Sequence, residues 1–304
     1  MSRLLAIDWG SSALRGALIA DDGRVLDERH AARGMLTVEA GGFDAVFEEH
    51  FGDWMDEPGT RCLMAGMVGS QQGWVEAAYC PCPAGVVELA GALTRVGDAS
   101  ARRRDIAIVP GLSCDHDGIP DVVRGEEIKV IGALDLLGLR DAVIVSPGTH
   151  SKWLTVEGAR IARFSTVMSG EFYALLRQHS ILARTLPPED GELDIEAFDR
   201  GLSLAWQGHS LMQTAFSVRT LALFERIPSA AMPSYLSGLV IGEEMRCRPL
   251  ERVDSVVVIG SLVLAERFER ALGQRGVGVQ RLGDEAGWRG LWTIDRQRRG
   301  AREN

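Results

Sequence analysis

Residues 8–15 read Asp-Trp-Gly-Ser-Ser-Ala-Leu-Arg, and this stretch decides the fold. The apolar run Leu4–Asp8 predicts a buried strand that ends in a carboxylate, and the glycine turn Gly10–Ser12 returns the chain to a second strand, Ala13–Ala20. A third strand is predicted over Arg24–His30. The chain therefore opens with an antiparallel three-stranded meander.

The same order of elements is expected again about 135 residues further on. The second set of strands is predicted at Asp141–Ser146, Ser151–Val156 and Arg160–Thr166. The repeat is one of pattern, because few residues are identical between the copies. We expect an α/β protein of two lobes, an N-terminal lobe over residues 1–124 and a C-terminal lobe over 125–304 that begins with a bridging helix at Gly125–Gly138.

Apolar residues at helical spacing predict several further helices around these meanders. These helices cover Phe43–Met55, Glu196–Gln207, Leu211–Arg226, Pro233–Cys247 and Leu262–Leu272. Two more buried strands are predicted at Arg61–Val68 and Ser255–Ile259.

Composition excludes several classes of partner. The 304 residues carry a net charge of −9, so the surface repels nucleic acid and anionic membranes. A negatively charged small molecule would need a local pocket of cations, backbone N–H groups or Mg²⁺. Five cysteines, with no second pair near Cys80-Pro81-Cys82, favour reduced thiols in the cytoplasm over disulfides or zinc.

The first hairpin carries groups that suit a nucleotide phosphate. Gly10, Ser11 and Ser12 offer backbone N–H groups and hydroxyls, while Asp8 can hold Mg²⁺ or its water shell. The alternative is a structural hairpin in which Asp8 accepts turn hydrogen bonds.

The second hairpin is similar in chemistry, which favours the phosphate interpretation. Its turn contains Gly148, Thr149, His150, Ser151 and Lys152, again glycine, hydroxyls and cations. Two such hairpins could hold one triphosphate between the lobes, and positioning with charge neutralisation dominates phosphoryl transfer.

Two carboxylates open the bridging helix. Glu126 and Glu127 lie in its first turn, where acidic side chains also compensate the helix dipole. We expect one of them to have that structural role and Glu126 to act as the general base for an attacking hydroxyl.

The loop after the strand that ends near Val68 could bind a sugar. Ser70, Gln71 and Gln72 could hydrogen-bond hydroxyls, and Trp74 could stack on a carbon face; a plain exposed loop is the alternative. Arg15 suits a substrate carboxylate, because its fork binds that anion through two bonds, although an ordinary surface ion pair is also possible.

Three motifs together resemble the sugar-kinase, heat-shock ATPase and actin superfamily. They are Asp8-x-Gly10-Ser11-x-x-x-Arg15, Pro147-Gly148-Thr149, and Val256–Ile259 followed by Gly260-Ser261. The resemblance implies two duplicated ribonuclease-H-like lobes of the actin-like ATPase type, with ATP in the interlobe cleft and Gly260 and Ser261 against adenosine. No P-loop or dinucleotide-binding motif occurs in the sequence.

Further motifs resemble the 2-dehydro-3-deoxygalactonokinase family over essentially the whole chain. They are Asp8–Ser12, Gly73-Trp74, Arg124–Glu127, Ser146–Trp153, Met168–Phe172 and Ser217–Arg219. The resemblance implies ATP- and Mg²⁺-dependent phosphorylation of the C6 hydroxyl of 2-dehydro-3-deoxy-D-galactonate, in D-galactonate breakdown. Glu126 stands where many superfamily kinases have Asp, and Gly260-Ser261 where a Gly-Gly pair is common.

Two other functions stay open at this point. One is a kinase of another sugar or sugar acid on the same fold, and the other is a sugar-responsive binding protein without turnover. The sequence leaves open whether Glu126, Glu127 or Glu171 is the base, and whether the protein is a homodimer.

Overall fold

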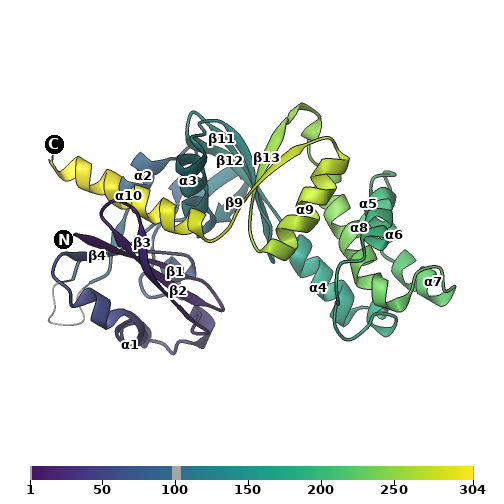
Figure 1. Cartoon of the computed structure of the whole chain (residues 1–304), viewed down its shortest axis with the longest axis horizontal. Coiled ribbons are helices and arrows are strands. Elements are labelled where there is room, and N and C mark those ends of the chain that lie inside the picture. The colour runs from purple at the N-terminus through teal and green to yellow at the C-terminus, as the bar shows by residue number, and fades with distance from the viewer. Residues whose placement is uncertain (1, 98–103, 304) are drawn as a thin grey trace. The chain divides into compact units, whose positions relative to one another are not determined.

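The computed structural model describes residues 2–97 and 104–303 (Figure 1). The chain forms two compact units: the first unit comprises residues 1–144, 154–165 and 282–304, and the second comprises residues 145–153 and 166–281. The predicted boundary between duplicated lobes at residue 124 is a different division, and it stays a prediction.

The largest sheet has six strands in the order β3-β2-β1-β4-β7-β6. They are β1 (Arg3–Trp9), β2 (Leu14–Ala20), β3 (Val25–Ala31), β4 (Thr60–Ala65), β6 (Thr94–Arg95) and β7 (Ile106–Ile108). β1 pairs antiparallel with β2, β2 antiparallel with β3, and β1 parallel with β4. The predicted opening meander is confirmed.

A five-stranded sheet has the order β12-β11-β10-β13-β14. Its strands are β10 (Ala142–Ser146), β11 (Ser151–Glu157), β12 (Arg160–Val167), β13 (Ser255–Ile259) and β14 (Gly278–Leu282). In each sheet the first strand of a meander lies between its second strand and a later fourth strand. This shared order confirms the expected repeat and the ribonuclease-H-like α/β fold class.

A small third sheet and ten α-helices complete the described fold. The third sheet consists of β5 (Cys80–Pro81), β8 (Leu112–His116) and β9 (Ile119–Val123). The helices are α1 (Phe43–Met55), α2 (Val86–Gly91), α3 (Glu126–Leu137), α4 (Ser169–His179), α5 (Ile195–Ala205), α6 (Leu211–Thr214), α7 (Ser217–Leu223), α8 (Met232–Arg246), α9 (Leu262–Gln274) and α10 (Glu285–Glu303).

Two sequence-based predictions are wrong in detail. The helix expected over residues 211–226 is broken into α6 and α7, because the Ser217 hydroxyl donates to Thr214 O and also bonds the Tyr235 hydroxyl, 2.7 Å away. The strand expected to run to Val68 ends at Ala65, and Gly66 at φ +95° turns the chain into a short 3₁₀ helix.

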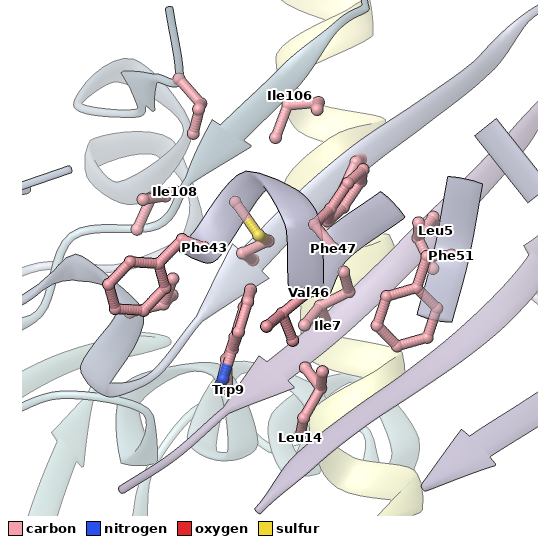
Figure 2. Packing of buried hydrophobic residues seen from close by; sticks show 14 of the residues in the cluster. Leu5, Ile7, Trp9, Leu14, Phe43, Val46, Phe47, Phe51, Ile106 and Ile108 are labelled. Carbon is pink, nitrogen blue, oxygen red and sulfur yellow. The ribbon is translucent and has the colours of Figure 1, made fainter. Parts of the chain in front are cut away.

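Alternation along β1 explains the core of the first unit. Leu5, Ile7 and Trp9 face α1 and join a buried aromatic cluster with Phe43 and Phe47 (Figure 2). The opposite face of β1 therefore presents Asp8 toward the side where α10 contacts the strand.

Helices α3 and α10 approach one another through glycines. A Cβ on Gly132 would lie 1.8 Å from Ala286 O, and a Cβ on Gly290 would lie 1.8 Å from Ile128 O. Any larger residue would force the two helices apart, so these glycines fix where α3 runs in the first unit. That position places the start of α3 beside the end of β1, as described below.

Candidate active site

Asp8, Gly66 and Gly125 bring three elements of the first unit together. A Cβ on Gly66 would lie 3.2 Å from Asp8 Oδ1, and a Cβ on Gly125 would lie 3.4 Å from Gly66 Cα. Gly66 and Gly125 both have positive φ, +95° and +109°, which glycine adopts without steric cost. The end of β1, the end of β4 and the start of α3 therefore meet at the Asp8 carboxylate.

The Asp8 carboxylate lies in a mixed field of charges. Burial raises the pKa of Asp8 above its ordinary value, while the positive charges of Lys129 and Arg15 lower it and the negative charge of Asp284 raises it. Sequence analysis missed Lys129, although it follows Glu126 by three residues and so shares its helix face.

Arg15 pairs across the hairpin with Asp8 in strand register, yet its side chain forms an ion pair elsewhere. Its Nη1 donates to Asp284 Oδ1 at 2.8 Å, and both side chains are substantially exposed. An exposed pair of this kind is weak, so Arg15 can exchange it for another carboxylate.

The turn of the first hairpin is held by backbone hydrogen bonds. Gly10 N donates to Ala13 O at 3.0 Å, while Gly10 O and Ser11 O accept from Met35 N and Leu36 N. Ser11 and Ser12 are exposed. Their hydroxyls are therefore placed on a fixed backbone and are open to a ligand.

Glu126 and Glu127 both reach back to the backbone before α3. Glu126 Oε2 accepts from Arg124 N at 3.1 Å, and Glu127 Oε2 accepts from Gly125 N at 2.7 Å. Glu127 is fully buried, and this burial, with the charge of Glu126 as a second cause, raises the pKa of Glu127 to about 8. Only Glu126 keeps part of its surface exposed, which favours it as the carboxylate that meets a substrate.

The predicted sugar-binding loop divides into exposed and packed residues. Gln71 and Gln72 are exposed, whereas Ser70 is half-buried with its hydroxyl 3.4 Å from Met35 Sδ. The Trp74 ring contacts the aromatic core, with centroid distances of 6.3 Å to Trp9 and 5.5 Å to Phe47. Trp74 thus has a structural role, and its stacking on a sugar stays a prediction.

In the second unit, the turn after β10 is backed by the start of α4. A Cβ on Gly170 would lie only 2.2 Å from Gly148 O, and Glu171 N donates to Thr149 O at 2.9 Å. The turn after β13 is also adjacent, since a Cβ on Gly260 would lie 3.4 Å from Pro147 O. Pro147-Gly148-Thr149 and the Gly260-Ser261 turn therefore lie side by side in one unit.

A cavity of about 410 Å³ opens at these turns. Its lining includes four residues of the second hairpin and several residues of helices that the sequence did not connect to it. The residues are Pro147, Gly148, Thr149, Ser151, Ser169, Gly170, Tyr173, Asp190, Gly191, Ser237, Val240, Ile241, Val263, Leu264, Arg267 and Phe268. Mixed apolar walls with a few polar groups suit a nucleoside.

The remaining predicted nucleotide residues have other partners. His150 Nε2 lies 2.5 Å from Glu171 Oε2, and the buried Lys152 donates from Nζ to Thr166 Oγ1 at 2.7 Å. Ser261 Oγ caps α9 by accepting from Leu264 N at 3.5 Å. His150, Lys152 and Ser261 do not line the cavity, and their contact with a nucleotide stays a prediction.

No metal-ligand cluster occurs among residues 2–97 and 104–303: no three His, Cys, Asp or Glu side chains are grouped to hold an ion. No helix in the same ranges is long and apolar enough to cross a membrane. A single carboxylate is compatible with Mg²⁺ that arrives on a nucleotide, because this ion keeps several waters and uses one or two carboxylates plus phosphates. Asp8, partly exposed beside the side-chain-free Gly66, fits that requirement.

Comparison with known proteins decides the family. The family model for 2-keto-3-deoxy-galactonokinase matches residues 8–294, which include both hairpins. The chain belongs to the 2-keto-3-deoxy-galactonokinase family. Among curated members, the 2-dehydro-3-deoxygalactonokinase of Escherichia coli K12 is 34% identical, covering 96% of this chain and 97% of its own. A probable 2-dehydro-3-deoxygalactonokinase of Rhizobium meliloti strain 1021 is also 34% identical, over 95% and 97% of the two chains.

Solved structures agree with this family assignment. A crystal structure of a 2-dehydro-3-deoxygalactonokinase-like protein from Sinorhizobium meliloti has a TM-score of 0.88 and 35% identity, covering 96% of this chain and 98% of its own. A ROK family glucokinase from Streptomyces griseus has a TM-score of 0.53 at 12% identity, covering 97% and 100%, and shows the shared fold alone. The chain therefore shares its fold with this glucokinase.

Proposed function

We propose that this protein transfers the γ-phosphoryl group of ATP to the C6 hydroxyl of 2-dehydro-3-deoxy-D-galactonate, giving the 6-phosphate and ADP in D-galactonate catabolism. The observation that carries this proposal is the family match over residues 8–294, together with 34% identity to curated kinases along nearly the full chain. The exposed hydroxyls of the first hairpin and the cavity at the second support it.

The nucleotide would occupy the cavity of the second unit, with its phosphates near the hairpins. When bound, Mg-ATP supplies the phosphoryl group. Gly148, Thr149 and Ser151 line the cavity at its hairpin end, and Gly260 adjoins them from the turn after β13. We further propose that Gly10, Ser11 and Ser12 contact the same triphosphate, and that His150, Lys152 and Ser261 assist.

Asp8 would hold the water shell of the magnesium ion. The positive charges of Lys129 and Arg15 favour the charged carboxylate that this role needs, against the effect of burial. Magnesium is proposed from the family's reaction and from the fit of Asp8.

Glu126 would accept the proton of the C6 hydroxyl as it attacks. Its carboxylate lies at the start of α3, which meets the Asp8 site through Gly125 and Gly66. Arg15 would bind the substrate carboxylate, and Ser70, Gln71, Gln72 and Trp74 would lie along the sugar chain.

We place the reaction in the cytoplasm, because ATP is a cytoplasmic substrate. We also propose that the protein is a homodimer, which light scattering would test.

Product analysis tests the proposed function. The protein is incubated with Mg-ATP and 2-dehydro-3-deoxy-galactonate, and the products are identified by mass spectrometry, with the C4 epimer as a matched control substrate. The proposal predicts one added phosphate on C6 and equal release of ADP. A product formed only from another sugar acid would favour the alternative kinase, and ATP binding without turnover on any acid would favour a binding protein.

A further inference from the structure

Glu244 is a buried carboxyl group that none of the proposed catalytic steps uses. It lies on α8 and is only 3% exposed. Burial raises the pKa of Glu244, because removing a carboxylate from water disfavours its charged form. A buried carboxyl group needs hydrogen-bond partners inside the protein, whereas a hydrocarbon side chain at the same position would need none.

The strongest partner of Glu244 is the indole of Trp153. Trp153 Nε1 donates to Glu244 Oε1 at 2.6 Å, and the Trp153 side chain is 5% exposed. Trp153 follows Ser151 by two residues on β11, so the two side chains point to the same face of the strand. Glu244 is therefore bonded to the strand that leaves the second phosphate hairpin.

A pair of hydroxyls connects this strand to the start of α4. The oxygens Ser151 Oγ and Ser169 Oγ are 3.0 Å apart and both side chains are buried. Both hydroxyls lie close enough to Glu244 to lower its pKa, as does the guanidinium of Arg248. Ser151 and Ser169 also line the proposed nucleotide cavity.

The start of α4 is in turn pressed against the hairpin. Gly170 leaves no room for a side chain beside Gly148 O, and Glu171 N donates to Thr149 O. Two elements thus reach one carboxyl group from α8: β11 of the hairpin through the Trp153 indole, and the start of α4 through the Ser169 hydroxyl.

We propose that Glu244 is a positioning residue for ATP binding. Through Trp153, Ser151 and Ser169, the Glu244 carboxyl group holds the second hairpin in place. An apolar residue of similar volume would fill the space without the desolvation cost of a buried carboxyl, but it could not fix the direction of the indole and the hydroxyls. This inference rests on the proposed function only in that ATP binds at the cavity.

Binding measurements on the full chain test this role without requiring turnover. Glu244→Leu should raise the Kd for Mg-ATP roughly tenfold, because the indole N–H loses its buried acceptor and the two serine hydroxyls lose a neighbouring carboxyl group. The Kd for the sugar acid should stay within twofold. Glu244→Gln keeps an acceptor for Trp153 and can donate from its amide to a serine hydroxyl, so it should restore ATP affinity to within about threefold.

Trp153→Phe provides a second variant that leaves the carboxyl in place. It removes the indole donor together with part of the buried ring, and it should weaken Mg-ATP binding in the same selective way, even where Glu244→Leu does not fold. The control is Phe198→Leu, a fully buried residue of α5 whose backbone oxygen lies against Gly238 of α8 and which does not line the cavity. It should lower Tm while leaving both Kd values unchanged.

The outcomes separate this inference from the proposed function. Wild-type protein that binds no ATP would refute the proposed function itself. The positioning role would be overturned if the wild type binds ATP and Glu244→Leu or Trp153→Phe has the same Kd for ATP. It would also be overturned if either variant lost affinity for ATP and for the sugar acid to the same extent. A Glu244→Gln variant as weak as Glu244→Leu would overturn the hydrogen-bond argument.

Discussion

Gly170 lies at the second position of α4, directly against the phosphate hairpin. In a helix, replacing glycine by alanine normally stabilises by up to about 1 kcal/mol. Here the added Cβ would lie 2.2 Å from Gly148 O and 2.9 Å from Thr149 Cα. Both contacts are with the hairpin, so neither a rotamer change nor a small side-chain shift relieves them.

The hairpin or the helix must therefore move by roughly 1 Å in Gly170→Ala, since close-packed atoms do not approach so far. Overpacking of this kind costs about 1–3 kcal/mol of unfolding free energy. A displacement of about 1 Å at a substrate-positioning element can cost ~10²-fold in rate. We expect kcat/KM for ATP to fall by about that factor, and KM for the sugar acid to change little.

The assay couples ADP release to a spectrophotometric signal at varied ATP, alongside denaturant unfolding. Gly273→Ala in α9 is the matched control, because nothing lies within 4 Å of its added Cβ and its φ is not positive. It should raise stability by about 0.5–1 kcal/mol with unchanged kinetics. Gly170→Ala with kcat/KM for ATP within threefold of wild type would show that the hairpin does not position the nucleotide.

Three further predictions concern the carboxylates and Arg15 of the first unit. Glu126→Gln should keep ATP and substrate binding but lose ~10²–10⁴-fold in kcat, and a near-normal kcat would move the role of base to Glu127 or Glu171. Because burial raises the pKa of Glu127 to about 8 from 4.5, the folded chain holds a proton that the unfolded chain loses, so stability falls as pH rises between those values. The unfolding free energy of Glu127→Gln, measured relative to that of the wild type, should therefore rise by at least ~1 kcal/mol from about pH 5 to above pH 8. A difference between the two proteins that does not change with pH would contradict the raised pKa of Glu127. Arg15→Ala should raise KM for the sugar acid by about 10–100-fold with KM for ATP unchanged. The control Asp284→Asn removes the ion-pair partner of Arg15 and should leave KM for the sugar acid unchanged. Equal effects of the two variants on this KM would show that Arg15 acts only through its ion pair.

Local sequence signals were sufficient for most of the fold. Short apolar runs separated by glycine turns predicted the strands of both meanders, and helical spacing predicted α1 and α8 to within a residue or so. The helix expected from Leu211 to Arg226 is broken, because the Ser217 hydroxyl donates to Thr214 O and also bonds the distant Tyr235 hydroxyl, which competes with helix continuity.

Sequence signals suggested the turn residues of the candidate site, but not the residues that reach it through packing. The candidate residues of both hairpins are contiguous in the sequence, whereas Tyr173 and Arg267 reach the cavity of the second unit from helices far apart in the chain. Lys152 stays a predicted nucleotide-binding residue: its neighbour Ser151 lines the cavity and Lys152 does not, as expected for adjacent strand residues that point to opposite faces.

The central claim is that both glycine hairpins hold one nucleotide. Hydrogen exchange of the full chain, with and without a non-hydrolysable Mg-ATP analogue, measures this directly. Exchange should slow at Gly10–Ser12 and at Gly148–Ser151 together, and both effects should saturate at the same analogue concentration. Protection of one hairpin alone, or of the two at different concentrations, would contradict it.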